Sequence, residues 1–190
     1  TVINEDIMTL NLNSLMDLVL KSQSTLYHFS PVCSEFTPNK APVFKQKAFV
    51  DGTSTLDMTL DIINIVDRGM PPCVLVENVH QYMKSDIYKA LSLRLRRMGY
   101  SEYSDIYEAQ NYGGKTLRKR YYGFFTLLPA HFHMPEIKQS TQSIWDIVQK
   151  HLSQCRNVDG SKAIQKGKAT GRLRVLSKDS QFSPTITRSQ

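Results

Sequence analysis

The chain has 190 residues and a net charge of +7, and 41% of its residues are hydrophobic. This composition allows an ordinary soluble core, while no apolar run approaches the roughly 20 residues that a membrane-spanning helix requires. Three widely spaced cysteines, Cys33, Cys73 and Cys155, exclude a disulfide framework and favour a reducing cytoplasm. Because the sequence has no Cys-x-x-Cys pair, we expect no metal site.

The positive charge favours a polyanionic partner, because each contact with a phosphate releases counterions. Much of this charge lies between Lys150 and Gln190, where nine basic residues accompany only Asp159 and Asp179. Such a segment could line a nucleic-acid groove or be a solvated tail, and its charge alone does not choose between them.

Apolar residues follow helical and strand spacings in alternation along the chain. We expect helices over residues 12–20, 54–68, 85–99 and 143–152, and strands over residues 25–30, 73–76, 104–109 and 120–128. Ser54 and Ser85 are expected to cap two helices, and Gly69 and Gly99 to end them. The alternation predicts an α/β fold with a parallel sheet and helices on both faces. Ligands of such sheets sit beyond the carboxyl ends of the strands.

Two stretches lack this periodicity. Pro31 to Lys47 contains three prolines and is predicted to be a loop, whose unusual length favours a functional role. After Val158 the composition shifts to Gly, Ser, Lys and Gln. This predicts a loop-rich segment, or one that only a partner orders.

Three segments hold residues with reactive or charged side chains. The segments are Ser30 to Thr37, with Cys33; Val74 to Val79, with Glu77 and Asn78; and Tyr112 to Arg120, with Arg118 and Arg120. Taken singly, each has an ordinary explanation as a free cysteine, an acid at a sheet edge or an exposed basic face. Together and in this order they closely resemble the DNA (cytosine-5) methyltransferase family, with its Pro-Cys loop, Glu-Asn-Val motif and Tyr-Gly…Arg-x-Arg motif.

The resemblance implies a Rossmann-like S-adenosylmethionine-dependent methyltransferase sheet, incomplete, with an irregular basic C-terminal segment. It implies a partial catalytic domain over residues 1–130, a connecting helix over 131–158 and the start of the target recognition region over 159–190. S-adenosylmethionine would be the cofactor and double-stranded DNA the partner.

The resemblance also assigns roles to residues. The Cys33 thiolate would add to carbon 6 of a flipped-out cytosine, which makes carbon 5 able to accept a methyl group. Glu77 would protonate or hydrogen bond ring nitrogen 3, and Arg118 and Arg120 would supply cationic donors. Asn78, with Val79, would support the nucleophile loop. Asp6, Ile7 and Pro31 would bind the cofactor, and DNA would contact Ser34, Lys40, Lys115, Arg172 and Arg174.

This sequence departs from the family pattern at several places. Val32 separates Pro31 from Cys33, where the family has Pro directly before Cys, so the fixed φ of proline is lost there. Pro72-Cys73 resembles the Pro-Cys motif as well, but Cys73 begins an apolar strand only four residues before Glu77. This spacing leaves no room for the helix that the family has between its nucleophile and its Glu, so Cys33 is the candidate. The family's glycine-rich cofactor loop and most of its recognition region are missing. The chain could therefore be a split-gene subunit, a degenerate remnant or a fragment of a larger polypeptide, and we expect full activity only with a partner that supplies the missing parts. The resemblance also implies a bacterial or phage cytoplasm and a role in restriction-modification.

Two alternatives stay open. The chain could be a catalytically inactive DNA-binding or assembly subunit of the same fold. It could also be a thiol hydrolase that pairs Cys33 with a histidine, although none of the five has a recognisable partner motif. These histidines are His28, His80, His131, His133 and His151.

Overall fold

The computed structural model describes residues 11–22, 25–33, 35–36, 54–129, 133, 135–137, 141–154, 160–171 and 175–184. The chain divides into two compact units. The first comprises Thr1–Tyr107 and Lys119–Met134, and the second Glu108–Arg118 and Pro135–Gln190. The three domains predicted from the sequence stay a prediction, since this division into units does not test them.

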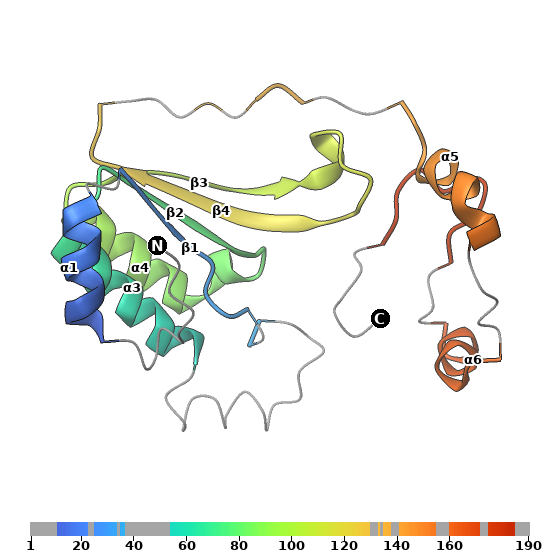
Figure 1. Cartoon of the computed structure of the whole chain (residues 1–190), viewed down its shortest axis with the longest axis horizontal. Coiled ribbons are helices and arrows are strands. Elements are labelled where there is room, and N and C mark those ends of the chain that lie inside the picture. The colour runs from blue at the N-terminus through green and yellow to red at the C-terminus, as the bar shows by residue number, and fades with distance from the viewer. Residues whose placement is uncertain are drawn as a thin grey trace. The chain divides into compact units, whose positions relative to one another are not determined.

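A four-stranded sheet with the order β1-β2-β4-β3 is the centre of the first unit (Figure 1). In chain order its elements are α1 (Leu12–Ser22), β1 (Leu26–Phe29), α3 (Thr55–Gly69), β2 (Cys73–Val79), η1 (Tyr82–Lys84), α4 (Asp86–Arg97), β3 (Ser101–Glu108) and β4 (Lys119–Thr126). The predicted α/β class is confirmed, and each predicted helix and strand of this unit is present.

The sheet is mixed, although the sequence predicted a parallel one. β1 and β2 are parallel, but β4 runs antiparallel to β2. Only residues 109–118 separate β3 from β4, and the helix among them, η2 (Ala109–Asn111), is a single turn. A parallel return needs a crossover of a dozen or more residues, so β4 comes back in the opposite direction.

The helices α1, α3 and α4 form one layer, on the same side of the sheet (Figure 1). The described α-helices of this unit thus cover one face, whereas the alternation predicted helices on both faces. Side chains of α3 and α4 meet the alternate residues of β2 and β4 that point toward this layer. The core so formed includes Ile62, Val66, Val74, Val76, Leu91, Leu95, Tyr121 and Phe125.

Both predicted serine caps are present. The Ser54 side chain accepts from Asp57 N in a capping box, and that of Ser85 accepts from Tyr88 N. Gly99 ends α4 with φ +97°, as predicted. Gly69, however, is the last residue of α3, and Met70 takes the left-handed position with φ 39°.

Gly69 instead packs closely against a side chain of β1. A Cβ built on Gly69 would lie 2.5 Å from the hydroxyl oxygen of Tyr27 and 2.9 Å from its ring. The aromatic side chain of β1 therefore occupies the space beside the end of α3 that any larger residue would need.

Strand β2 is longer than its apolar run. The prediction ended the strand at Val76, but pairing with β4 continues through Glu77↔Tyr122 and Val79↔Arg120. Cross-strand pairing decides strand length more than intrinsic preference does, so the charged side chain of Glu77, which was predicted to follow the strand, lies within the sheet.

A carboxylate with 14% of its side chain exposed links α4 to β3. Glu102 accepts hydrogen bonds from the hydroxyls of Tyr88, Ser92 (2.5 Å) and Ser104 (2.8 Å), and Arg96 lies 3.8 Å away. Desolvation alone would raise the pKa of Glu102, but the three hydroxyl donors and the arginine together hold it below its usual range.

The second unit contains η2, α5 (Ile144–Val148), η3 (Gln149–Gln154) and α6 (Lys162–Ala169). Ser143 caps α5 through Asp146 N, near the start of the predicted helix. The segment after Val158, which was predicted to be loop-rich, contains one short helix, α6, and its other described residues are irregular. The residues of α6 are exposed or half-buried, so no apolar period marks it, and the helical preference of Lys, Ala and Gln accounts for its formation.

Candidate functional site

Glu77 and Arg120 form an ion pair on the sheet face away from the helix layer. They are diagonal neighbours on β2 and β4, because Glu77 pairs with Tyr122 and Val79 pairs with Arg120. The Nε atom of Arg120 lies 3.1 Å from Oε1 of Glu77, and both side chains are about four-fifths buried, with 19% and 20% exposed. Ser30 Oγ donates to Oε2 of Glu77 at 2.6 Å. Both carboxylate oxygens are thereby held in fixed directions.

Asn78 points to the opposite face of the same strand and is buried. Its Nδ2 donates to the carbonyl of Pro31 at 3.0 Å, and its Oδ1 accepts from Val79 N at 2.8 Å. The side chain therefore ties β2 to the segment that follows β1, two residues before Cys33.

The segment that contains Cys33 is held at the start of α3 as well. Thr55 Oγ1 donates to the carbonyl of Val32 at 2.6 Å, and Thr55 N donates to the Glu35 carboxylate at 2.9 Å. A tight turn closes when Phe36 N donates to the carbonyl of Cys33 at 3.1 Å. Three consecutive carbonyls, those of residues 31, 32 and 33, thus accept hydrogen bonds from fixed donors.

Aromatic packing also holds the turn formed by Cys33 and Phe36. The ring of Phe36 packs edge-on against Tyr82, with centroids 5.5 Å apart, and Tyr82 lies against Tyr88 and Tyr121. Burial raises the pKa of Tyr82 to about 12, so its phenol stays neutral. Cys33 itself is a half-buried free thiol.

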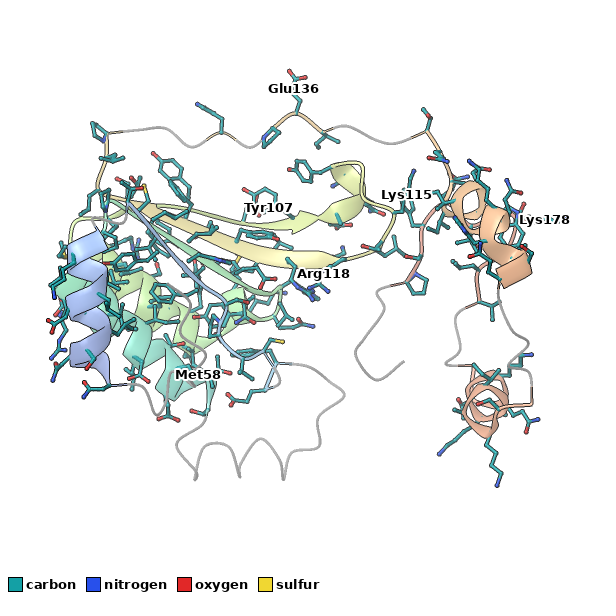
Figure 2. The ribbon with its side chains drawn as sticks, viewed as in Figure 1. Met58, Tyr107, Lys115, Arg118, Glu136 and Lys178 are labelled. Atoms are coloured by element: carbon teal, nitrogen blue, oxygen red, sulfur yellow. The ribbon has the colours of Figure 1, made fainter. Side chains whose placement is uncertain are left out.

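Of the predicted arginines, Arg120 belongs to the site in the first unit, whereas Arg118 belongs to the second unit. Arg118 is exposed, and its carbonyl accepts from Ala109 N at 2.9 Å. Lys115, also in the second unit, donates from Nζ to the carbonyl of Gln142; Figure 2 labels both side chains. Hydrogen bonds between the backbones of residues 115–117 and Ser183 fix this stretch.

Of the remaining predicted site residues, only Pro31 lies among the described residues. Asp6, Ile7, Ser34, Lys40, Arg172 and Arg174 lie outside the described residues. Pro31 is described, is buried, and its carbonyl is occupied by Asn78. The described residues by themselves therefore do not make up an S-adenosylmethionine site.

Ser30, Glu35 and Thr55 are parts of this arrangement that the sequence reasoning missed. One signal was available for Glu35, which is the sole acid between Pro31 and Lys47 and precedes a capped helix. Ser30 and Thr55 gave no signal, because their partners lie 47 and 20 to 23 residues away. Among the described residues no three His, Cys, Asp or Glu side chains gather as a metal site, and none of the described helices could span a membrane.

Solved methyltransferase structures share this fold. A methyltransferase of Entamoeba histolytica, EhMeth, matches with a TM-score of 0.71 and 17% identity over 99% of this chain and 56% of its own. The Dnmt2 methyltransferase of S. pombe matches with a TM-score of 0.68 and 17% identity over 98% of this chain and 56% of its own. The fold is thus that of a Rossmann-like methyltransferase, and the chain spans just over half the length of these structures.

The family follows from the sequence match. The model of the C-5 cytosine-specific DNA methylases matches residues 42–188, and the chain belongs to this family. Glu77, Asn78, Arg118 and Arg120 lie inside the matched range, and Cys33 precedes it. No curated protein matches the chain. The resemblance recognised in the sequence is therefore confirmed at the level of the family.

Proposed function

We propose that this chain provides the base-modifying centre of a DNA (cytosine-5) methyltransferase, which transfers a methyl group from S-adenosylmethionine to carbon 5 of a flipped-out cytosine. The observation that supports this most is the Glu77 carboxylate, held between Ser30 Oγ and Arg120 Nε. It lies on the strand whose next residue, Asn78, fixes the loop of a free cysteine.

In this proposal Cys33 acts as the nucleophile. Its thiolate forms a bond from sulfur to carbon 6 of the cytosine, and the displaced electron pair makes carbon 5 nucleophilic. Once carbon 5 has accepted the methyl group, it loses its proton to a base and the sulfur–carbon bond breaks. The thiolate leaves with its electron pair, so the ring regains its double bond and the enzyme is unchanged.

Glu77, once its carboxyl is protonated in the closed site, would donate a hydrogen bond to nitrogen 3 and stabilise the ring during this addition. Arg120, whose Nε lies 3.1 Å from Glu77, is then assigned to hold that carboxylate in place. Arg118 is left as the donor for the cytosine carbonyl, a role suited to a planar guanidinium that stays charged.

The cofactor and DNA contacts are proposals from the family. S-adenosylmethionine would supply the methyl group, with Asp6, Ile7 and Pro31 beside it. DNA would contact Ser34, Lys40, Lys115, Arg172 and Arg174, and Lys115 would have to exchange its Gln142 carbonyl for a phosphate. No comparison supports a second polypeptide, so the assay below is run both with and without a candidate partner.

The test is transfer of labelled methyl groups from S-adenosylmethionine to duplex DNA that contains cytosine or 5-fluorocytosine. The 5-fluorocytosine duplex should become covalently attached to the parent protein, because fluorine at carbon 5 prevents release of the thiolate. Cys33→Ser should abolish attachment and transfer, whereas Cys73→Ser, a matched change of the other described half-buried thiol, should retain both.

Three results would contradict the proposal in different ways. Equal transfer by Cys33→Ser and the parent would remove Cys33 as the nucleophile. DNA binding without transfer or attachment, with cofactor and partner present, would favour the inactive subunit. Transfer to an RNA transcript of the same sequence, and not to the duplex, would retain the chemistry and overturn DNA as the substrate.

A further inference from the structure

We propose that Thr55 and Glu35 are positioning residues that hold the Cys33 loop in its reactive geometry. They tie this loop to the first residue of α3 and replace a constraint that the sequence lacks. The kinetic part of this inference rests on the proposed function, whereas its structural part can be tested without any methyl transfer.

The loop needs an external constraint at Val32. Its neighbour Pro31 has a φ fixed by its ring, but Val32, directly before Cys33, does not. The valine side chain is 44% exposed, so packing fixes it only in part. Its carbonyl, however, accepts from Thr55 Oγ1 at 2.6 Å, and the preceding carbonyl accepts from Asn78. The peptide units on both sides of Val32 are thereby oriented.

Thr55 is well suited to this task. It is fully buried at the first turn of α3, beside the Ser54 cap. A β-branched side chain in a helix has few accessible rotamers, so its hydroxyl is aimed with little loss of entropy. Its amide is one of the free donors that every helix start presents, and Glu35 accepts from it.

Helix capping alone does not explain Glu35. The start of α3 already has a complete capping box formed by Ser54 and Asp57. A second acid from 20 residues earlier in the chain adds a tie between the loop and the helix, and its negative charge at the positive end of the helix dipole strengthens that tie. The pair therefore connects the loop to the helix on either side of Cys33, at Val32 and at Glu35.

The first experiment measures how often the loop opens. In protein that also contains Cys73→Ser and Cys155→Ser, the rate of Cys33 alkylation by a small maleimide reports this opening. Thr55→Val, which keeps the shape and removes the hydroxyl, should raise the rate about tenfold. Thr55→Ser, which keeps the hydroxyl, should stay within about twofold of the parent.

Thr59→Val is the matched control. Thr59 is equally buried and one turn further along α3, and its hydroxyl donates to the carbonyl of Thr55 at 2.7 Å rather than to the loop. It should affect global unfolding by urea about as much as Thr55→Val does, and leave Cys33 alkylation within about twofold of the parent. Equal alkylation of the two valine variants would overturn the proposal.

Glu35 variants test the second tie. Glu35→Gln retains an acceptor for Thr55 N and should change alkylation by less than about threefold, whereas Glu35→Ala should raise it about fivefold. An Ala variant that matches the parent would remove Glu35 from the proposal.

The second experiment measures the rate of attachment to 5-fluorocytosine DNA. Thr55→Val should lower this rate about tenfold, because a small misplacement of the nucleophile is costly. Adding Val32→Pro, which restores the fixed φ, should recover much of the loss. Absence of recovery would contradict the assigned role of Thr55. Absence of attachment by the parent would contradict the proposed function and leave the alkylation result standing.

Discussion

The two faces of the sheet use polar residues in opposite ways. On the face toward the helices, Asn78 is buried and the Glu102 side chain is 14% exposed, and both are bonded to other parts of the protein. On the other face, Glu77 and Arg120 keep about a fifth of their side chains exposed. The neighbours Glu77 and Asn78 show that one strand can orient a loop with one residue and present a charged group with the next.

The largest expected effect is on the helix face, at Gly123. This glycine pairs with Val76, and the side chain of Tyr121 occupies the space where a Cβ would lie. Gly123→Ala should lower the free energy of unfolding by about 3 kcal/mol, because the added methyl displaces a buried ring. Urea denaturation measures this. Gly160→Ala, whose methyl would meet nothing within 4 Å, should be nearly neutral, and equal losses would show that the Tyr121 ring moves freely.

The next prediction compares the neighbours on β2 directly. Asn78→Ala should cost about 2 kcal/mol of stability, since it leaves the carbonyl of Pro31 without its donor. Glu77→Gln keeps the shape of the side chain and an oxygen acceptor for Arg120, and should cost less than about 1 kcal/mol but reduce methyl transfer about a hundredfold. Urea unfolding and the labelled transfer assay separate the two effects. The reverse order of stability losses would contradict the assignment of support to one face.

Stability should also depend on pH through Glu102. Because its pKa is lower in the folded protein than its ordinary value of 4.5, the unfolded chain binds the proton more tightly. The stabilisation is complete above 4.5 and is lost as the pH falls through the lower, folded value.

Glu102→Gln should cost about 1 kcal/mol at neutral pH and reduce the fall in the urea midpoint between neutral pH and a pH below 4.5. A variant whose midpoint falls as steeply as that of the parent would assign the acid sensitivity to other carboxylates.

The smallest effect is expected on the less buried face. Leu26 is 48% exposed at the start of β1, so Leu26→Ser should change stability by less than about 0.5 kcal/mol. Val74→Ala on the helix face, where the side chain is fully buried, should cost about 2 kcal/mol or more. A large cost at Leu26, measured by urea unfolding, would mean that this face is packed as tightly as the other.

Local signals in the sequence predicted the helices and the caps well. Ser54 and Ser85 stand directly before amphipathic runs, and such patterns depend on nearby residues alone. The order of Cys33, Glu77, Asn78 and Arg120 pointed to the family, because short motifs can be recognised in the sequence without knowledge of the fold.

What could not be predicted depends on contacts between distant residues. The direction and pairing of β4 decide that Arg120 meets Glu77, and neither residue reveals that register alone. The Thr55 hydroxyl and the Glu35 carboxylate look like ordinary polar side chains until the loop is folded against α3. Helix α6 was missed for the opposite reason, since it buries too little to leave an apolar pattern.

Helix α3 ends through Met70, whose backbone is in the left-handed conformation. Glycine adopts the left-handed conformation without strain, but Gly69 is the last helical residue and lies beside the Tyr27 ring. The next residue, Met70, adopts that conformation instead, with φ 39°. A side chain in that conformation costs about 1–2 kcal/mol. Met70 is 43% exposed, and its amide already donates to the carbonyl of Val66. Met70→Gly would remove this backbone strain and should give a more stable protein for crystallisation. The residues assigned to catalysis would be unchanged.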